Sequence, residues 1–360
     1  MRVLFKKIKN NSIFHSIILV LVAFVFGIFI NRGISTSVTS LGLYYQELSQ
    51  TLPNFEGTRF PQRILLPLLS FITNLDVQIL NIIFLFLFLL SVDYYFQKKL
   101  DFLLRFLYLI GLSTTMVFQF TIIYGGYPDI LSLLLYVFAL KNLDNHKCYL
   151  YLFLNLLTRE AAIVMLPIFF LIKGNENFIN KLKNFTLLVI IYLPIYFYFE
   201  QSDSIDSNGW EFYLLPLQDD LFFWFNKSSE FYWLGLFSSV KFFLILIPFI
   251  IKSFNDILLL IISIFCINIQ FIVSGGDNTR YWLLLIIPII YLTFHNLDSN
   301  KVMKSFFVLI IILNIITPKY YVFSDAYEGS MYVRPNDSRI HFFDIQNLVF
   351  NKINFTNLFK

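Results

Sequence analysis

Charged residues are scarce in this sequence. Only 14% of its 360 residues are Asp, Glu, Lys or Arg, whereas 58% are hydrophobic. A soluble domain of this length does not need so much apolar material to fill its core, so lipid is the expected solvent for much of the chain. The net charge of +4 comes from basic residues scattered over short loops, which excludes a nucleic-acid-binding surface.

Cysteine and histidine are also scarce. Cys148 and Cys266 each lie in an apolar stretch, and none of the 4 histidines has the spacing of a metal ligand. These absences exclude a disulfide framework, a zinc site and a thiol nucleophile. No metal-binding residue is predicted, although a divalent metal stays open as a cofactor.

Long apolar runs dominate the chain and predict an all-α, polytopic membrane protein. About ten of them are long enough to cross a bilayer, or nearly so. They cover residues 13–30, 77–96, 106–123, 130–140, 149–172, 185–199, 237–251, 257–273, 281–294 and 305–316. The first run follows basic residues but is too long for a signal core and lacks a cleavage site, so it is expected to be an uncleaved span. Residues 1–317 are predicted to form one transmembrane helical domain.

The run at residues 149–172 decides the orientation. If it crosses once, the basic cluster Lys173, Lys181 and Lys183 lies outside, against the positive-inside tendency. If it dips in and returns, broken at residues 158–160, the cytoplasmic side collects 15 of the 27 basic residues and only 6 of the 23 acidic ones. We therefore predict a re-entrant broken helix in the cell membrane, a cytoplasmic N-terminus and an extracytoplasmic tail at residues 318–360.

This topology places five polar segments on the extracytoplasmic side: the first outer loop at 31–63, the turn at 124–129, the break at 158–160, the loop at 200–236 and the segment at 274–280. Arg59 and Arg63 stand at the edge of an apolar helix, where arginine can hold a phosphate bidentately or anchor at lipid headgroups. Tyr127 and Asp129 form a turn leading into a helix, for which helix capping is the simpler explanation.

Two pairs of charged residues stand within or beside apolar runs. Arg159 and Glu160 interrupt one, where charges are costly and mark either a site or a compulsory ion pair. Asp277 and Arg280 follow two glycines and precede Tyr281, and a local salt bridge at a surface turn would explain them equally well.

Glu47 and Glu56 are the candidate general bases of the first outer loop. A carboxylate there could take the proton from an acceptor hydroxyl. A solvated loop glutamate is the alternative for both.

Four segments carry a resemblance to a known class. They are Arg63-Ile64-Leu65-Leu66-Pro67-Leu68-Leu69, Tyr127-Pro128-Asp129, Arg159-Glu160 and Asp277-Asn278-Thr279-Arg280-Tyr281. In type and order they resemble motifs of bacterial members of the polytopic GT-C glycosyltransferases, which use polyprenyl-phosphate-linked sugars. The resemblance implies a GT-C-like fold, and inverting transfer of a sugar from such a donor to an envelope glycan, lipid or protein acceptor. An acidic residue of the first outer loop would act as the base, but that loop contains no aspartate.

The leading hypothesis assigns roles accordingly. The predicted catalytic residues are Glu47, Asp129 and Glu160, and the predicted phosphate ligands are Arg59, Arg63, Arg159 and Arg280. Glu56, Tyr127, Asp277 and Tyr281 are predicted to support the site. The expected partners are membrane lipids, the lipid-linked sugar donor and an unknown acceptor. A polysaccharide polymerase of the O-antigen type, a transporter or flippase, and a structural membrane subunit remain alternatives, although ionisable residues are too rare in the spans to favour an ion-coupled carrier.

Overall fold

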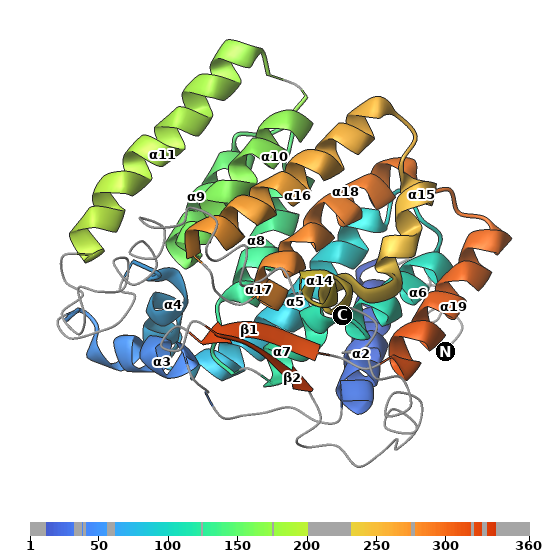
Figure 1. The fold of residues 1–360 in the computed structure, drawn as a ribbon, viewed down its shortest axis with the longest axis horizontal. Helices are drawn as coiled ribbons and strands as arrows, with labels where there is room; N and C mark the ends of the chain where they lie inside the picture. The colour runs from blue at the N-terminus through green and yellow to red at the C-terminus, as the bar shows by residue number, and fades with distance from the viewer. Residues whose placement is uncertain are drawn as a thin grey trace, which may run out of the picture.

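The computed structural model describes residues 12–31, 38, 41–55, 62–123, 125–174, 176–200, 232–274, 278–317, 320–325 and 330–335. In these ranges the chain forms a bundle of helices with one two-stranded antiparallel sheet (Figure 1). The all-α prediction is confirmed for the bundle. The paired strands β1 (Tyr320–Asp325) and β2 (Ser330–Pro335) lie in the predicted tail and were not expected.

The N-terminal part of the bundle runs from α2 to α11. Its helices are α2 (Ser12–Asn31), α3 (Leu41–Thr51), α4 (Leu65–Thr73), α5 (Val77–Phe96), α6 (Phe102–Ser113), α7 (Met116–Ile123), α8 (Asp129–Lys141), α9 (Lys147–Thr158), the 3-10 helix η1 (Glu160–Met165), α10 (Leu166–Ile172) and α11 (Phe178–Glu200). Helix α8 packs between α5 and α9, and almost its whole length is buried by protein. Helix α11 lies at the outer edge of the bundle (Figure 1).

The C-terminal half packs along the other side of the bundle. Its elements are α14 (Tyr232–Val240), η3 (Lys241–Leu246), α15 (Ile247–Ile250), α16 (Phe254–Ser274), α17 (Asn278–Trp282), η4 (Leu283–Leu285), α18 (Ile286–Asn296) and α19 (Lys301–Ile316). Short 3-10 turns divide what the sequence shows as continuous apolar runs. Strand β1 lies against α14 and α17.

Three helices are long and apolar enough to cross a membrane: Ile13–Asn31, Val77–Phe96 and Phe178–Phe199. Helices α6 and α7 would make a fourth span if counted together, although they meet at a bend of 53°. These helices indicate a membrane protein. The prediction of about ten spans is not supported by the described residues, because several of the predicted runs form helices too short to cross alone.

The bend between α6 and α7 has a local cause. The hydroxyls of Thr114 and Thr115 donate to the backbone oxygens of Gly111 (2.6 Å) and Leu112 (2.7 Å). Such bonds compete with the helical ladder and bend the helix. The side-chain nitrogen of Asn31, at the end of α2, donates to the backbone oxygen of Ser113 at 3.0 Å, so a carbonyl at the end of α6 is satisfied by another helix.

The chain reverses direction between α9 and α10. The Nζ atom of Lys173 donates to the backbone oxygens of Leu143 and Asn145, and the Tyr149 hydroxyl donates to Glu176 at 2.5 Å. The residues before α9 therefore touch those after α10, with the turn at Arg159. This is the geometry that a broken hairpin requires, and its position in a membrane stays a prediction.

Candidate functional site

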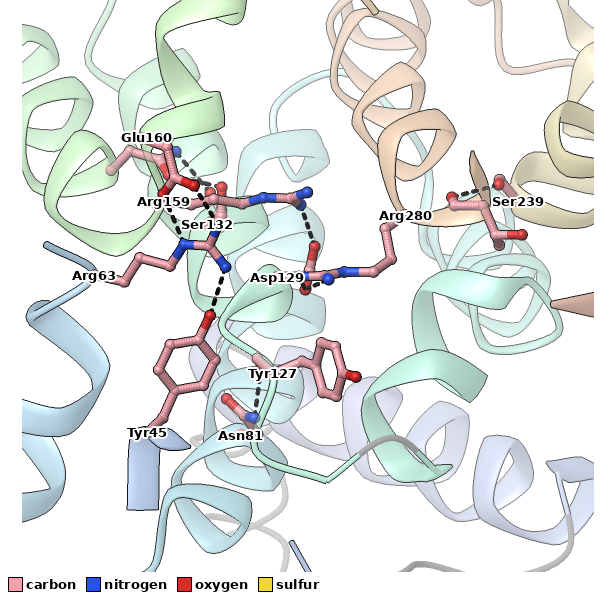
Figure 2. Close-up of polar contacts among 12 residues, drawn as sticks. Tyr45, Arg63, Asn81, Tyr127, Asp129, Ser132, Arg159, Glu160, Ser239 and Arg280 are labelled. Carbon is pink, nitrogen blue, oxygen red and sulfur yellow. Dashed lines mark hydrogen bonds and ion pairs between the residues drawn. The ribbon is translucent and has the colours of Figure 1, made fainter. Parts of the chain in front are cut away.

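Five charged side chains meet where four separate segments of the chain approach one another (Figure 2). Arg63 precedes α4, Asp129 begins α8, Arg159 and Glu160 form the turn between α9 and η1, and Arg280 lies on α17. We call these five residues the arginine cluster. All of them lie outside the helices that are long enough to cross a membrane.

Arg63 and Glu160 form a bidentate ion pair. The Nε atom of Arg63 donates to Oε2 of Glu160 at 2.7 Å, and its Nη2 atom pairs with Oε1. The remaining terminal nitrogen, Nη1, donates to the hydroxyl of Tyr45 on α3 at 2.7 Å. Both charged side chains keep some contact with solvent, with 13% of Arg63 and 20% of Glu160 exposed. This paired fork is the geometry in which a guanidinium binds a carboxylate or a phosphate most strongly.

Asp129 joins two further arginines. Its Oδ1 atom pairs with Nη1 of Arg159, and its Oδ2 atom accepts from Nη2 (2.8 Å) and Nε (3.1 Å) of Arg280. All three side chains are at most 6% exposed. Because guanidinium groups occupy both carboxylate oxygens, Asp129 does more here than begin a helix.

Aromatic rings cover the two buried arginines. The guanidinium carbon of Arg280 lies 4.6 Å from the ring centroid of Tyr127 and 5.7 Å from that of Phe120. The corresponding atom of Arg159 lies 5.2 Å from the ring centroid of Tyr281. Cation–π contacts at these distances stabilise a charge that has lost its water.

Polar residues of α5 hold the turn that carries Tyr127. The Gly126 backbone N–H donates to Oε1 of Gln78 at 2.9 Å, and the side-chain nitrogen of Asn81 donates to the backbone oxygen of Tyr127 at 2.7 Å. Gly126 has a φ of +90°, a conformation that residues with a Cβ atom rarely adopt. The backbone of the turn is therefore held by α5, independently of the contacts that its side chains make in the cluster.

Two more contacts orient the helices around the cluster. The Ser132 hydroxyl donates to Oδ1 of Asn155 at 2.7 Å, and the Asn155 side chain donates back to the Ser132 backbone oxygen at 3.0 Å, which joins α8 to α9. The Ser239 hydroxyl on α14 donates to the Thr279 backbone oxygen at 2.8 Å. Thr279 precedes Arg280, so this bond fixes α17 against α14 (Figure 2).

The arginine cluster holds three positive and two negative groups, so it carries one positive charge in excess. Burial alone would raise the pKa of Asp129, but the guanidinium groups of Arg280 and then Arg159 outweigh it, and the pKa of this carboxyl lies below its ordinary value. Arg159 also has a buried Nε atom with no hydrogen-bond partner among the described residues. A buried donor without an acceptor is unusual. It marks a position where a ligand oxygen could accept a hydrogen bond from the Arg159 Nε–H group.

The structure brings together seven of the residues that the sequence singled out: Arg63, Tyr127, Asp129, Arg159, Glu160, Arg280 and Tyr281. Glu47 is not among them, because it lies on the exposed face of α3, two residues from the buried Tyr45. Its side chain makes no hydrogen bond to another described residue. Glu56, Arg59 and Asp277 lie outside the described residues.

Sequence reasoning missed the residues that position the charges. These positioning residues are all buried: Tyr45, Gln78, Asn81, Ser132 and Asn155. A signal existed for Gln78, Asn81 and Asn155, since each is an amide in an otherwise apolar helix, where an unsatisfied polar group is costly. Nothing in the sequence distinguishes Tyr45 from the adjacent Tyr44.

The described residues contain no group of three or more His, Cys, Asp or Glu side chains that could hold a metal ion. Comparison of the chain with protein-family models, with curated proteins and with solved structures gives no match.

Proposed function

We propose that this protein is a membrane glycosyltransferase that transfers a sugar from a polyprenyl-phosphate donor to an envelope glycan, lipid or protein acceptor on the extracytoplasmic face. The observation that carries the proposal is the arginine cluster itself, which gathers three guanidinium groups and two carboxylates from four segments. The resemblance of these segments to GT-C motifs supports the same function.

The charges of the cluster suit an anionic phosphate. A phosphodiester carries one negative charge, which would balance the one positive charge in excess. Guanidinium groups bind phosphate oxygens in pairs, and they do so more strongly where water is scarce. Simple headgroup anchors would extend to the surface, whereas Arg159 and Arg280 are almost fully buried.

The proposed reaction uses a carboxylate and the arginines in different roles. A carboxylate takes the proton of the acceptor hydroxyl while the acceptor oxygen forms a bond to the anomeric carbon of the sugar. The bond from that carbon to the phosphate oxygen breaks, and its electron pair leaves with the lipid phosphate. The arginines stabilise the charge that develops on the leaving phosphate. The carboxylates predicted to be catalytic are Glu47, Asp129 and Glu160, and the sequence offers Glu47 and Glu56 as candidate bases of the first outer loop.

Incubation of the purified protein with a panel of polyprenyl-phosphate sugars and candidate acceptors tests the proposal. The expected result is release of polyprenyl phosphate from one donor or a few related donors, dependent on the acceptor. Arg280→Gln should abolish release, whereas Lys252→Gln, which breaks an exposed ion pair with Asp298, should not. Release from no donor by a folded protein would contradict the function. Release of polyprenyl pyrophosphate in a parallel assay with polyprenyl-pyrophosphate oligosaccharides would favour a polymerase.

A further inference from the structure

Glu160 cannot accept a proton readily in the arrangement that the structure shows. Both of its carboxylate oxygens bind the Arg63 guanidinium, at Nε and Nη2. Burial alone would raise the pKa of Glu160, but the Arg63 charge and its hydrogen bonds outweigh burial and lower this pKa. A general base needs an available carboxylate whose affinity for a proton is not depressed in this way.

We propose that Glu160 is the catalytic base, and that it becomes available only when the donor phosphate replaces it on Arg63. This inference rests on the proposed function and adds an order of substrate binding. The donor must bind before the acceptor can be deprotonated. The exchange replaces one planar pair of anionic oxygens with another, and a guanidinium accepts either in the same bidentate geometry.

The exchange is expected at Arg63 because this ion pair is the accessible one. Arg63 and Glu160 are 13% and 20% exposed, whereas Asp129 and its two arginines are at most 6% exposed. Asp129 is also held by two guanidinium groups, so its release would require the loss of two ion pairs. Among the side chains that the structure describes, Arg63 alone donates hydrogen bonds to Glu160, and Arg159 adds a weaker charge attraction.

Tyr45 keeps Arg63 in place during the exchange. Its hydroxyl accepts from Nη1 of Arg63, and this nitrogen takes no part in the bond to Glu160. The Tyr45 side chain is fully buried, so the contact has little freedom to move. Arg63 therefore stays oriented while its other two nitrogens pass from the carboxylate to the phosphate.

The released carboxylate then completes the reaction. The proton of the acceptor hydroxyl moves to a Glu160 oxygen as the acceptor oxygen bonds to the anomeric carbon. The bond between that carbon and the phosphate oxygen breaks, and the electron pair remains on the polyprenyl phosphate bound at Arg63. Departure of this product allows Glu160, once its proton is lost to water, to return to Arg63.

The experiment measures binding and turnover separately. Binding is followed by calorimetry with farnesyl phosphate, a short polyprenyl monophosphate, on the full chain in detergent. Glu160→Gln removes the competing charge, so it should bind this probe roughly tenfold more tightly, the factor expected when one charge-assisted contact no longer competes. The same variant should lose sugar transfer. Glu160→Asp keeps a carboxylate and should retain part of the transfer, which separates loss of the base from loss of the fold.

Glu176→Gln is the matched control. Glu176 is also paired with a basic residue, Lys173, but at the opposite end of the hairpin. It should change neither probe binding nor transfer. Equal or weaker probe binding by folded Glu160→Gln would overturn the exchange. Transfer at the wild-type rate by Glu160→Gln, or its loss in Glu47→Gln alone, would overturn the role of Glu160 as base.

Failure of the proposed function would look different. A wild-type protein that releases lipid phosphate from no donor would overturn the transferase assignment and the base with it. The tighter binding of farnesyl phosphate by Glu160→Gln would still be observed if carboxylate and phosphate compete for Arg63.

Discussion

At the scale of single residues, Asp129 determines how the charges are arranged. It receives ion pairs from arginines 30 and 151 residues away in the chain. Removal of one partner from a buried ion pair is strongly destabilising, because the remaining charge loses its compensation without regaining water. The cluster therefore contributes to the fold as well as to the proposed site, and the two contributions need separate measurements.

The contribution to the fold is tested by Asp129→Asn. This variant leaves two buried guanidinium groups without a counter-charge, so it should destabilise the protein by about 3–5 kcal/mol. Denaturation of the protein in detergent, followed by tryptophan fluorescence, measures the change. Asp298→Asn breaks the exposed pair with Lys252 and serves as the control, with little expected change in stability. Equal stability of the two variants would contradict the structural role of Asp129.

The contribution to binding is tested by replacing arginine with lysine. Lysine keeps the charge but cannot form the paired bonds of a guanidinium. We expect Arg63→Lys and Arg280→Lys to weaken donor binding by about ten- to a hundredfold, nearly as much as replacement by alanine. Affinity for the donor in detergent is the measurement, with Lys147→Ala as the unaffected control. Wild-type affinity in both lysine variants would exclude a phosphate site at these residues.

At the scale of elements, the turn between α7 and α8 connects the first outer loop to the site. A Cβ atom added at Gly42 on α3 would lie 2.1 Å from the Gly125 backbone oxygen, so α3 packs directly on this turn. The same helix presents Tyr45 to Arg63. The position of the first outer segment thus depends on a backbone contact that only glycine permits.

Gly126→Ala tests this dependence. The substitution requires an unfavourable φ of +90° and places a Cβ atom 2.8 Å from the Gly42 Cα atom. We expect a loss of stability of about 1–3 kcal/mol and weaker donor binding. Thermal unfolding and donor titration measure both. Gly174→Ala is the control, since nothing lies within 4 Å of a Cβ atom there. If both variants behave like the wild type, the turn is not the constraint that its geometry indicates.

The sequence could predict where the chain reverses, but it could not predict how the helices pack against one another. Charge placement predicted that the chain reverses near Arg159, and the contacts of Lys173 show the reversal. The described residues support three or four spans rather than about ten, because an apolar run does not reveal whether lipid or protein surrounds it. Helix α8 is apolar largely because α5 and α9 bury it. The pairing of Asp129 with Arg159 and Arg280 depends on how helices are rotated against one another, which no local pattern records.

At the scale of the whole molecule, the contacts divide the chain between two ends. The arginine cluster gathers at one end of α8 and α9, and the Lys173, Glu176 and Tyr149 contacts gather at the other. In the predicted topology the first end faces the outside and the second faces the cytoplasm. The hairpin would then return to the side from which it entered and add no crossing.

Cysteine labelling in intact cells tests this arrangement. The native cysteines are first replaced, as Cys148→Ala and Cys266→Ala, so that only the introduced cysteine can react. Both are buried, free thiols. We expect cysteines at Lys147 and Lys181 to resist an impermeant reagent and to react after permeabilisation, because the predicted topology places both on the cytoplasmic side. The sequence also predicted that Thr158 is reached from the outside, but its side chain is fully buried, so a cysteine there cannot report accessibility. Reaction of a cysteine at position 181 in sealed cells would contradict the hairpin.

The order of the cluster residues along the chain has a consequence for biosynthesis. The first four cluster residues to be made are Arg63, Asp129, Arg159 and Glu160. Their charges cancel among themselves, so this part of the cluster can assemble in the nascent chain without a net charge. Arg280 is made much later and docks with α17 onto α14. The excess positive charge therefore arises only when the last third of the protein is in place. A chain still on the ribosome would not yet attract the anionic lipid that the finished protein is proposed to use.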